Sequence, residues 1–120
     1  MRPNNTSDKL IFVNINKSYE ALMNNERESP FYRDTLYDCT VKYWRIADNK
    51  ANSATHILGC YKGKVIEVVR INSFTVASDE EYYGRKIFHG VEQRDSHYMN
   101  MDIRELFDSL ANFITKYWNI

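Results

Sequence analysis

The segment that most constrains the fold is residues 56–76, where two apolar runs are separated only by the dipeptide Lys62-Gly63. Both runs, residues 56–61 and 64–76, are rich in residues that favour strands, such as Val and Ile. A glycine at this place supplies the positive φ that a tight hairpin turn requires. The sequence therefore predicts a β-hairpin that leads into the rest of a sheet.

The second strand of this hairpin has apolar residues on both of its faces. Side chains alternate along a strand, so Val65 and Val69 point to one side while Ile66 and Val68 point to the other. Neither face is purely polar near the start of the strand. This pattern favours a partly closed barrel over an open, half-solvated meander.

The remaining patterns place further strands and helices around the hairpin. Residues 10–15 are an apolar run that suits a strand buried on both faces. Ser18 can cap a helix over residues 19–27, with Leu22 and Met23 facing the core. The other expected elements are a loop over 24–31, a helix over 34–46 opened by Asp34, a connection over 48–55 with room for a helical turn, an acidic loop over 78–83, a strand over 84–91 and a loop over 92–101.

The C-terminal segment has the clearest helical periodicity of the chain. Its apolar residues recur at spacings of three and four, at Ile103, Leu106, Phe107, Leu110, Ile114, Tyr117 and Trp118. Asp102 and Glu105 resemble a capping box. We expect this helix either to dock on its own sheet or, with Phe113 exposed, to form a homodimer. The element order β, α, α, β, β, β, α predicts an α+β fold: a small, barrel-like, mostly antiparallel sheet flanked by helices.

Length and charge bound the classes of function. A chain of 120 residues suits one domain, expected over residues 9–120 after a frayed N-terminus over 1–8. The formal net charge is zero, which argues against a non-specific DNA binder, although residues 33–70 carry seven basic and four acidic side chains. No segment approaches 18 apolar residues and no signal peptide is visible, so we expect a cytoplasmic protein without a membrane partner.

Metal and thiol chemistry find little support in the sequence. Cys39 and Cys60 lie among apolar residues and match no zinc spacing, so we expect buried free thiols. The histidines, His56, His89 and His97, match no ligand motif either. We expect no metal and no cofactor.

Several short motifs together carry a family resemblance. They are an aromatic helix end with Tyr43-Trp44-Arg45, the hairpin HILGCYKGKVIEVVRINSF, the strand GRKIFHG and the tripeptide Tyr98-Met99-Asn100. This combination, over residues 10–103, resembles the PUA-like class, which includes the EVE, ASCH and YTH domains. The resemblance implies a small β-barrel that grips a nucleotide or a modified base. Phe74 stands where this pattern prefers Trp, and Val41 stands where it often has Arg.

The resemblance and the side-chain chemistry together suggest a set of ligand-binding residues. They are Trp44, Arg45, Tyr61, Asn72, Ser73, Phe74, Arg85, Phe88 and His89. The indole of Trp44 can stack on a base or wedge its helix onto the sheet. Arg85 offers a guanidinium fork to phosphate or base edges, and Gly90 permits close approach of a ligand. Asn72 and Ser73 interrupt an apolar strand, so they mark either a ligand contact or a β-bulge.

The leading hypothesis is a non-enzymatic domain that recognises a nucleotide or modified base of nucleic acid through an aromatic cradle. One alternative is a small protein-interaction, defence or anti-defence protein that acts as an oligomer. Another is an amidohydrolase similar to ASCH enzymes, which would use Thr55, Lys62 or Lys64, and Glu67. Both lysines are expected at the hairpin tip, where water keeps them protonated, and this argues against a catalytic base.

Overall fold

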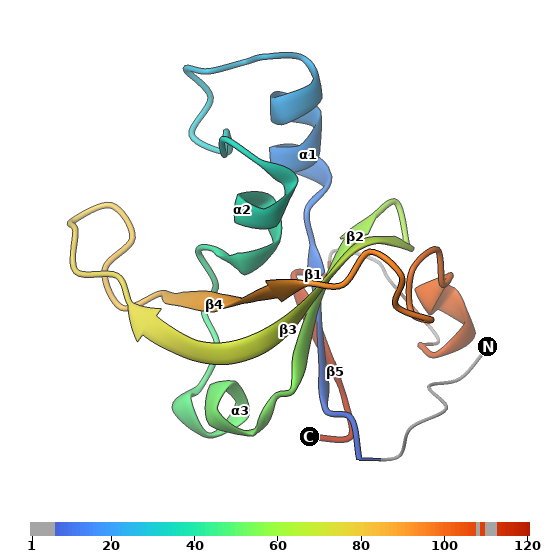
Figure 1. Ribbon diagram of the computed structural model, residues 1–120. Coiled ribbons are helices and arrows are strands. Elements are labelled where there is room, and N and C mark those ends of the chain that lie inside the picture. The colour runs from blue at the N-terminus through green and yellow to red at the C-terminus, as the bar shows by residue number, and fades with distance from the viewer. Residues whose placement is uncertain (1–6, 108, 110–112) are drawn as a thin grey trace.

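Five strands form one open, mixed sheet in the computed structural model, which describes residues 7–107, 109 and 113–120 (Figure 1). The strands are β1 (Leu10–Asn14), β2 (His56–Tyr61), β3 (Lys64–Val76), β4 (Lys86–Glu92) and β5 (Thr115–Trp118), in the order β4-β3-β2-β1-β5. β1 and β2 are parallel, and the other three neighbouring pairs are antiparallel. The α+β class is confirmed. Within the described residues β4 and β5 do not pair, so the expected barrel is not closed.

The hairpin of β2 and β3 forms as predicted. Lys62 and Gly63 have φ values of 50° and 82°, so both turn residues adopt the left-handed conformation typical of two-residue hairpins. The amide of Lys62 donates to Asn16 Oδ1 at 2.8 Å, which ties the turn to the first helix. Pairing starts at once, with Tyr61 opposite Lys64.

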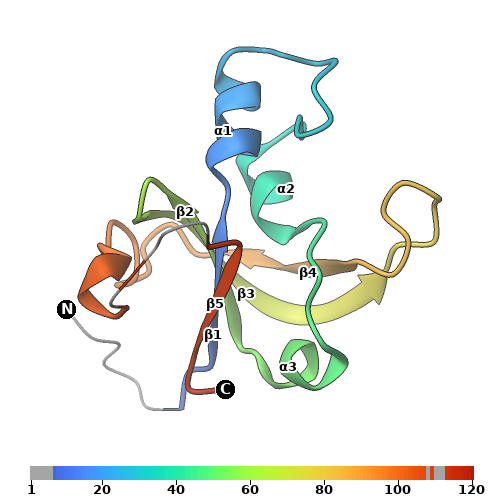
Figure 2. The ribbon, with the colours of Figure 1, turned by 180° about the vertical axis from the view of Figure 1, so that it is seen from behind.

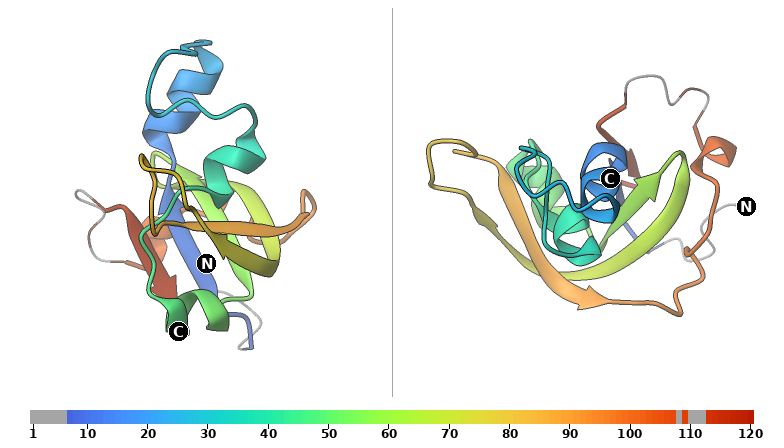
Figure 3. Two further views of the ribbon diagram at one scale, coloured as in Figure 1. Left: turned by 90° about the vertical axis from the view of Figure 1, so that its left-hand side faces the viewer. Right: turned by 90° about the horizontal axis from the view of Figure 1, so that it is seen from above.

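Two irregularities bend the sheet. Register shifts occur between Gly59 and Cys60 in β2 and between Ile71 and Ser73 in β3, so Asn72 lies at a β-bulge, one of the two alternatives predicted for Asn72 and Ser73. Bulges increase the twist and bend of a strand. Figure 3 shows the resulting sheet curved around the helices. A Cβ on Gly90 would lie 1.9 Å from the carbonyl oxygen of Arg70, so this glycine serves the close approach of the neighbouring strand.

The first helix, α1 (Asn16–Met23), begins earlier than predicted. Asn14 Oδ1 accepts the amide of Asn16 at 2.9 Å, whereas the hydroxyl of Ser18 donates to the Ile15 carbonyl and does not cap the helix. Met23 is 60% exposed, so its expected place in the core is wrong.

The second helix, α2 (Leu36–Val41), is shorter than predicted. Thr35, and not Asp34, is the N-cap, because its Oγ1 accepts the amide of Asp38 at 3.0 Å. The chain turns to extended backbone at Lys42, so Trp44 lies beyond the helix. The connection before β2 contains a short helix, α3 (Asp48–Ser53), in agreement with the expected helical turn.

The C-terminal helix predicted over residues 102–118 is wrong. The described residues of this segment contain a short 3₁₀-helix, η1 (Ile103–Glu105), and the strand β5, which lies beside β1 in the view from behind (Figure 2). β5 pairs with β1 in antiparallel register, with Trp118 opposite Leu10. The open edge of β1 supplies backbone partners that local periodicity does not encode. Leu110 lies outside the described residues. The helical surface expected to form a homodimer is therefore not present.

The centre of the sheet, formed by β1, β2 and the first half of β3, is buried on both faces. The helices cover one face, where Ile11, Val13 and Phe88 lie in the core. The segment after β4 covers the other face, where Leu10, Phe12 and Tyr98 are buried. Cys39 and Cys60 are buried and free, as predicted.

The residues before β1 are only partly described. Residues 1–6 of the predicted frayed segment lie outside the described part of the chain. Asp8 is anchored, because its Oδ2 accepts the buried hydroxyl of Tyr98 at 2.5 Å. In the described part of the chain, no helix has the length and apolar character needed to span a bilayer.

Candidate functional site

A cavity of about 490 Å³ lies where the sheet remains open. Its walls come from α1, from the chain on either side of α2, and from the residues just before the two edge strands. Arg85 immediately precedes β4 and Ile114 immediately precedes β5, and both line the cavity. This volume is within the range of small-molecule binding sites.

Trp44 forms part of one wall because the chain pairs with β4 after it leaves α2. Its amide donates to the Lys86 carbonyl at 3.1 Å, and the Lys86 amide donates to the Trp44 carbonyl at 2.7 Å. The indole Nε1 donates to the carbonyl of Thr40 at 2.7 Å. The ring also packs against the core on the helix-covered face. Trp44 therefore wedges this segment onto the sheet and lines the cavity as well.

A stacked tyrosine pair stands beside the cavity. The rings of Tyr43 and Tyr82 are 3.9 Å apart between centroids and only 3° from parallel. The hydroxyl of Tyr82 donates to the Pro30 carbonyl at 3.2 Å, and burial raises the pKa of this hydroxyl. These contacts hold the loop between β3 and β4 against the segment before α2.

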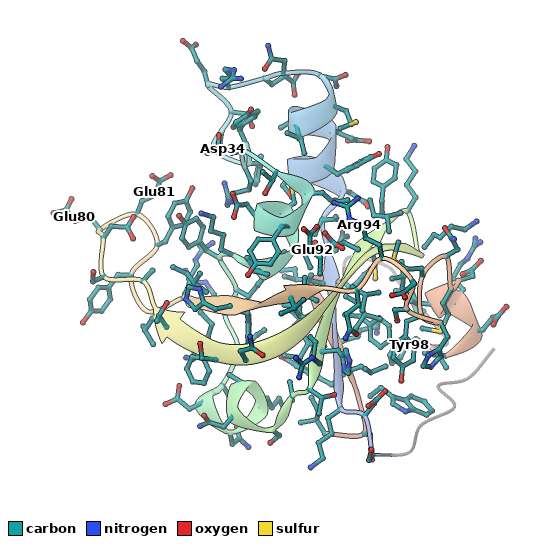
Figure 4. All side chains as sticks on the ribbon, viewed as in Figure 1. Asp34, Glu80, Glu81, Glu92, Arg94 and Tyr98 are labelled. Atoms are coloured by element: carbon teal, nitrogen blue, oxygen red, sulfur yellow. The ribbon has the colours of Figure 1, made fainter. Side chains whose placement is uncertain are left out.

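The charged residues that line the cavity are all cations: Lys17, Arg33, Lys42 and Arg85. Lys42 forms an ion pair with Asp38, at 3.8 Å between Nζ and Oδ1. Among the described residues, the other three have no carboxylate within ion-pair distance. Figure 4 shows Glu80 and Glu81 on the outer part of the loop between β3 and β4, and neither residue lines the cavity.

Both arginines lie beside the ring of Tyr82. The guanidinium carbons of Arg33 and Arg85 are 5.3 and 5.6 Å from its centroid, and that of Arg33 is also 5.0 Å from the centroid of Tyr43. Arg33 Nη1 donates to the carbonyls of Pro30 and Tyr32, at 3.1 and 2.8 Å. The Nε atoms of both arginines are shielded from solvent and have no acceptor. A buried N–H without a partner costs about 1–3 kcal/mol.

Three of the predicted ligand residues line a different cavity. Asn72, Ser73 and Phe74 face α3 across a second hollow of about 450 Å³, which is also lined by Asn52. This hollow carries amide and hydroxyl groups but no charged side chain. The single cradle expected from the sequence is therefore divided: Trp44 and Arg85 are in the first cavity, and these three residues are in the second.

The other predicted residues lie outside both cavities. Phe88 is 0% exposed in the core, because it pairs directly with Phe74 on the helix-covered face, so its ring cannot contact a ligand. Arg45 is exposed, and His89 is exposed with its Nε2 at 2.9 Å from the hydroxyl of Thr75. The hydroxyl of Tyr61, near the hairpin tip, donates to Glu20 at 2.9 Å.

Sequence reasoning missed several residues of the first cavity. Lys17 and Phe31 lie on α1 and on the following loop, with Lys17 Nζ 4.9 Å from the centroid of the Phe31 ring. Arg33 and Lys42 belong to the basic excess noted over residues 33–70, which was the one available signal.

The structure does not assemble the amidohydrolase residues. Thr55 precedes the first residue of β2, whereas Lys64 lies opposite Tyr61 at the other end of that strand. Lys62 and Lys64 are exposed, and Glu67 is buried. Across the described residues, no group of three or more His, Cys, Asp or Glu side chains is placed to hold a metal ion.

Comparisons of the chain with protein-family models, with curated proteins and with solved structures find no match. The first cavity and its residues are therefore the basis for assigning a function.

Proposed function

We propose that this chain is a non-enzymatic binding domain that recognises a nucleotide, or a base of nucleic acid, in the cavity of Trp44 and Arg85. The observation that carries the proposal is the combination of aromatic walls with four cations and no lining carboxylate. A nucleotide presents a flat π-surface at one end and a negative charge at the other. The proposal agrees with the expectation from the PUA-like resemblance.

The chemistry of the walls suits both ends of such a ligand. Stacking of a base on an aromatic side chain contributes about 1–3 kcal/mol. Trp44 and Tyr43 supply rings, and Trp44 is held in place by its own indole hydrogen bond to Thr40. Two of the cations lie against the ring of Tyr43, with the guanidinium carbon of Arg33 at 5.0 Å and Lys42 Nζ at 5.6 Å from its centroid. Attraction of an anion is stronger here than at a fully solvated surface, because the cavity is partly enclosed.

Intrinsic fluorescence tests the proposal. The chain has two tryptophans, Trp44 and Trp118, so Trp118→Phe leaves Trp44 as the single indole reporter. Nucleotides, nucleosides and modified oligonucleotides are titrated into this variant, and we expect binding to quench the emission of Trp44. In the natural chain, Trp44→Leu should weaken the same binding by about 5-fold or more, the equivalent of at least 1 kcal/mol.

Trp118→Phe is also the matched control for affinity, because Trp118 lines neither cavity. It should bind as tightly as the natural chain when binding is measured by calorimetry. Absence of binding to every member of the panel, or equal weakening by Trp44→Leu and Trp118→Phe, would contradict the proposed function.

A further inference from the structure

We propose that Arg33 and Arg85 form a phosphate subsite, so that the ligand is a nucleotide with a terminal phosphate and not a phosphate-free base or nucleoside. This inference rests on the proposed function and specifies its ligand. The subsite lies at the edge of the first cavity, where the loop between β3 and β4 meets the segment before α2.

The two guanidinium groups are gathered at one place by Tyr82. Both lie beside the same ring, at 5.3 and 5.6 Å from its centroid. Arg33 is oriented by hydrogen bonds from Nη1 to two backbone carbonyls, so little of its conformational freedom remains to be lost on binding. The backbone of Arg85 pairs with Ala77 and Tyr82, whereas no described residue accepts a hydrogen bond from its guanidinium Nε.

The hydrogen bonding of these side chains is incomplete in the same region. Arg33 Nε and Arg85 Nε are both shielded from solvent and both lack an acceptor. Buried polar groups in native proteins are nearly always paired, so two such atoms on neighbouring arginines need an explanation. Phosphate oxygens supply acceptors in the planar geometry that a guanidinium fork matches.

Charge favours a dianion at this place. The whole chain has a formal net charge of zero, yet only cations line the cavity. Lys17 lies against the ring of Phe31, and Lys42 lies against the ring of Tyr43, which Arg33 also contacts. A terminal phosphate carries nearly two negative charges at neutral pH and three open oxygens, whereas an internal phosphodiester carries one charge. Two arginines can therefore form more hydrogen bonds and ion pairs with a terminal phosphate than with an internal phosphodiester of a nucleic-acid backbone.

Calorimetry with matched ligands tests the subsite. The probes are the four ribonucleoside 5′-monophosphates, the corresponding nucleosides, a dinucleoside phosphodiester and inorganic phosphate. We expect the natural chain to bind a monophosphate at least 10-fold more tightly than its nucleoside and than the phosphodiester. Arg85→Gln should remove this preference, because it should weaken the binding of the monophosphate much more than that of the nucleoside.

Arg45→Gln is the matched control, because Arg45 is exposed and lines neither cavity. It should keep the full preference for the monophosphate. Arg85→Lys keeps the charge without the fork and should recover only part of the preference, and thermal unfolding of each variant confirms that it is folded. The inference is overturned if monophosphate and nucleoside bind equally to the natural chain, or if Arg85→Gln and Arg45→Gln behave alike.

Failure of the subsite and failure of the proposed function give different results. Nucleoside binding that depends on Trp44, without a preference for phosphate, overturns the subsite alone. A second outcome is that inorganic phosphate binds, that Arg85→Gln abolishes this binding, and that no nucleoside or nucleotide binds. This outcome supports the anion subsite and overturns the nucleotide function. Absence of binding by all of the probes overturns both.

Discussion

The buried carboxyl group of Glu67 makes the stability of this fold depend on pH. Glu67 lies in β3 opposite Gly59 and is 2% exposed. Its Oε1 accepts the amide of Val68 at 3.0 Å, whereas Oε2 is shielded from solvent and has no donor. Burial, followed by the hydrogen bond and negative charge of Glu92, raises the pKa of Glu67 to about 8 from an ordinary value of 4.5. We therefore expect Glu67 to be protonated near neutral pH and to donate to the Glu92 carboxylate.

The sign of the effect follows from proton linkage. Between pH 4.5 and pH 8 the folded chain holds a proton on Glu67 that the unfolded chain has lost. The free energy of unfolding therefore falls as pH rises through this window, by up to about 1.4 kcal/mol per pH unit. Over the whole window the loss reaches at most about 5 kcal/mol. Glu67→Gln keeps the shape and a donor toward Glu92 but cannot ionise, so it should remove this slope.

Urea unfolding at intervals from pH 5 to pH 9 measures the slope directly. The natural chain and Glu67→Gln should be similar in stability near pH 5, and the variant should be several kcal/mol more stable near pH 8. Glu80→Gln is the matched control, because Glu80 is exposed at a loop tip, and its curve should parallel that of the natural chain. If the curves of the natural chain and Glu67→Gln stay parallel from pH 5 to pH 8, the protonated state assigned to Glu67 is wrong.

Two further substitutions test how β4 is held. Gly90→Ala places a Cβ 1.9 Å from the Arg70 carbonyl oxygen, so β3 and β4 must separate, and we expect about 3 kcal/mol of destabilisation in urea unfolding; a loss below 1 kcal/mol would show that the strands adapt easily. Tyr37→Phe removes the hydroxyl that accepts the Gly90 amide at 3.0 Å. It should cost about 1 kcal/mol and accelerate hydrogen exchange at that amide, and an unchanged exchange rate would argue against this bond.

The elements that were predicted correctly are those specified by local chemistry. The hairpin needs only two strand-forming runs and a turn with positive φ at Gly63, and it forms with the expected bounds. The C-terminal segment shows the opposite case. Its apolar spacing is helical, yet Tyr117 and Trp118 pack against the two different faces of the sheet, as alternate residues of a strand do. The open edge of β1, which is remote in sequence from residues 115–118, therefore decides that this segment forms a strand and not a helix.

The candidate site could be predicted only in part for the same reason. Trp44 was predicted from its place at the end of an expected helix, and Arg85 from its place at the start of an expected strand. Lys17 and Arg33 were missed, since their place depends on how α1 and the following loop fold back over the sheet. Phe88 was assigned to the ligand because strand alternation alone does not say which face is buried, and here its face is the one covered by the helices.

The cavity depends on one short pairing between the chain after α2 and the start of β4. Because Trp44 pairs with Lys86, the adjacent residues Arg85 and Lys86 have different environments. Arg85 lines the cavity, whereas Lys86 is 8% exposed and its Nζ pairs with Asp48 at 2.8 Å. A shift of this pairing by one residue would exchange the two positions, since successive side chains of a strand face opposite sides. Register therefore decides which cation lines the cavity, and register is set by contacts between residues far apart in the sequence.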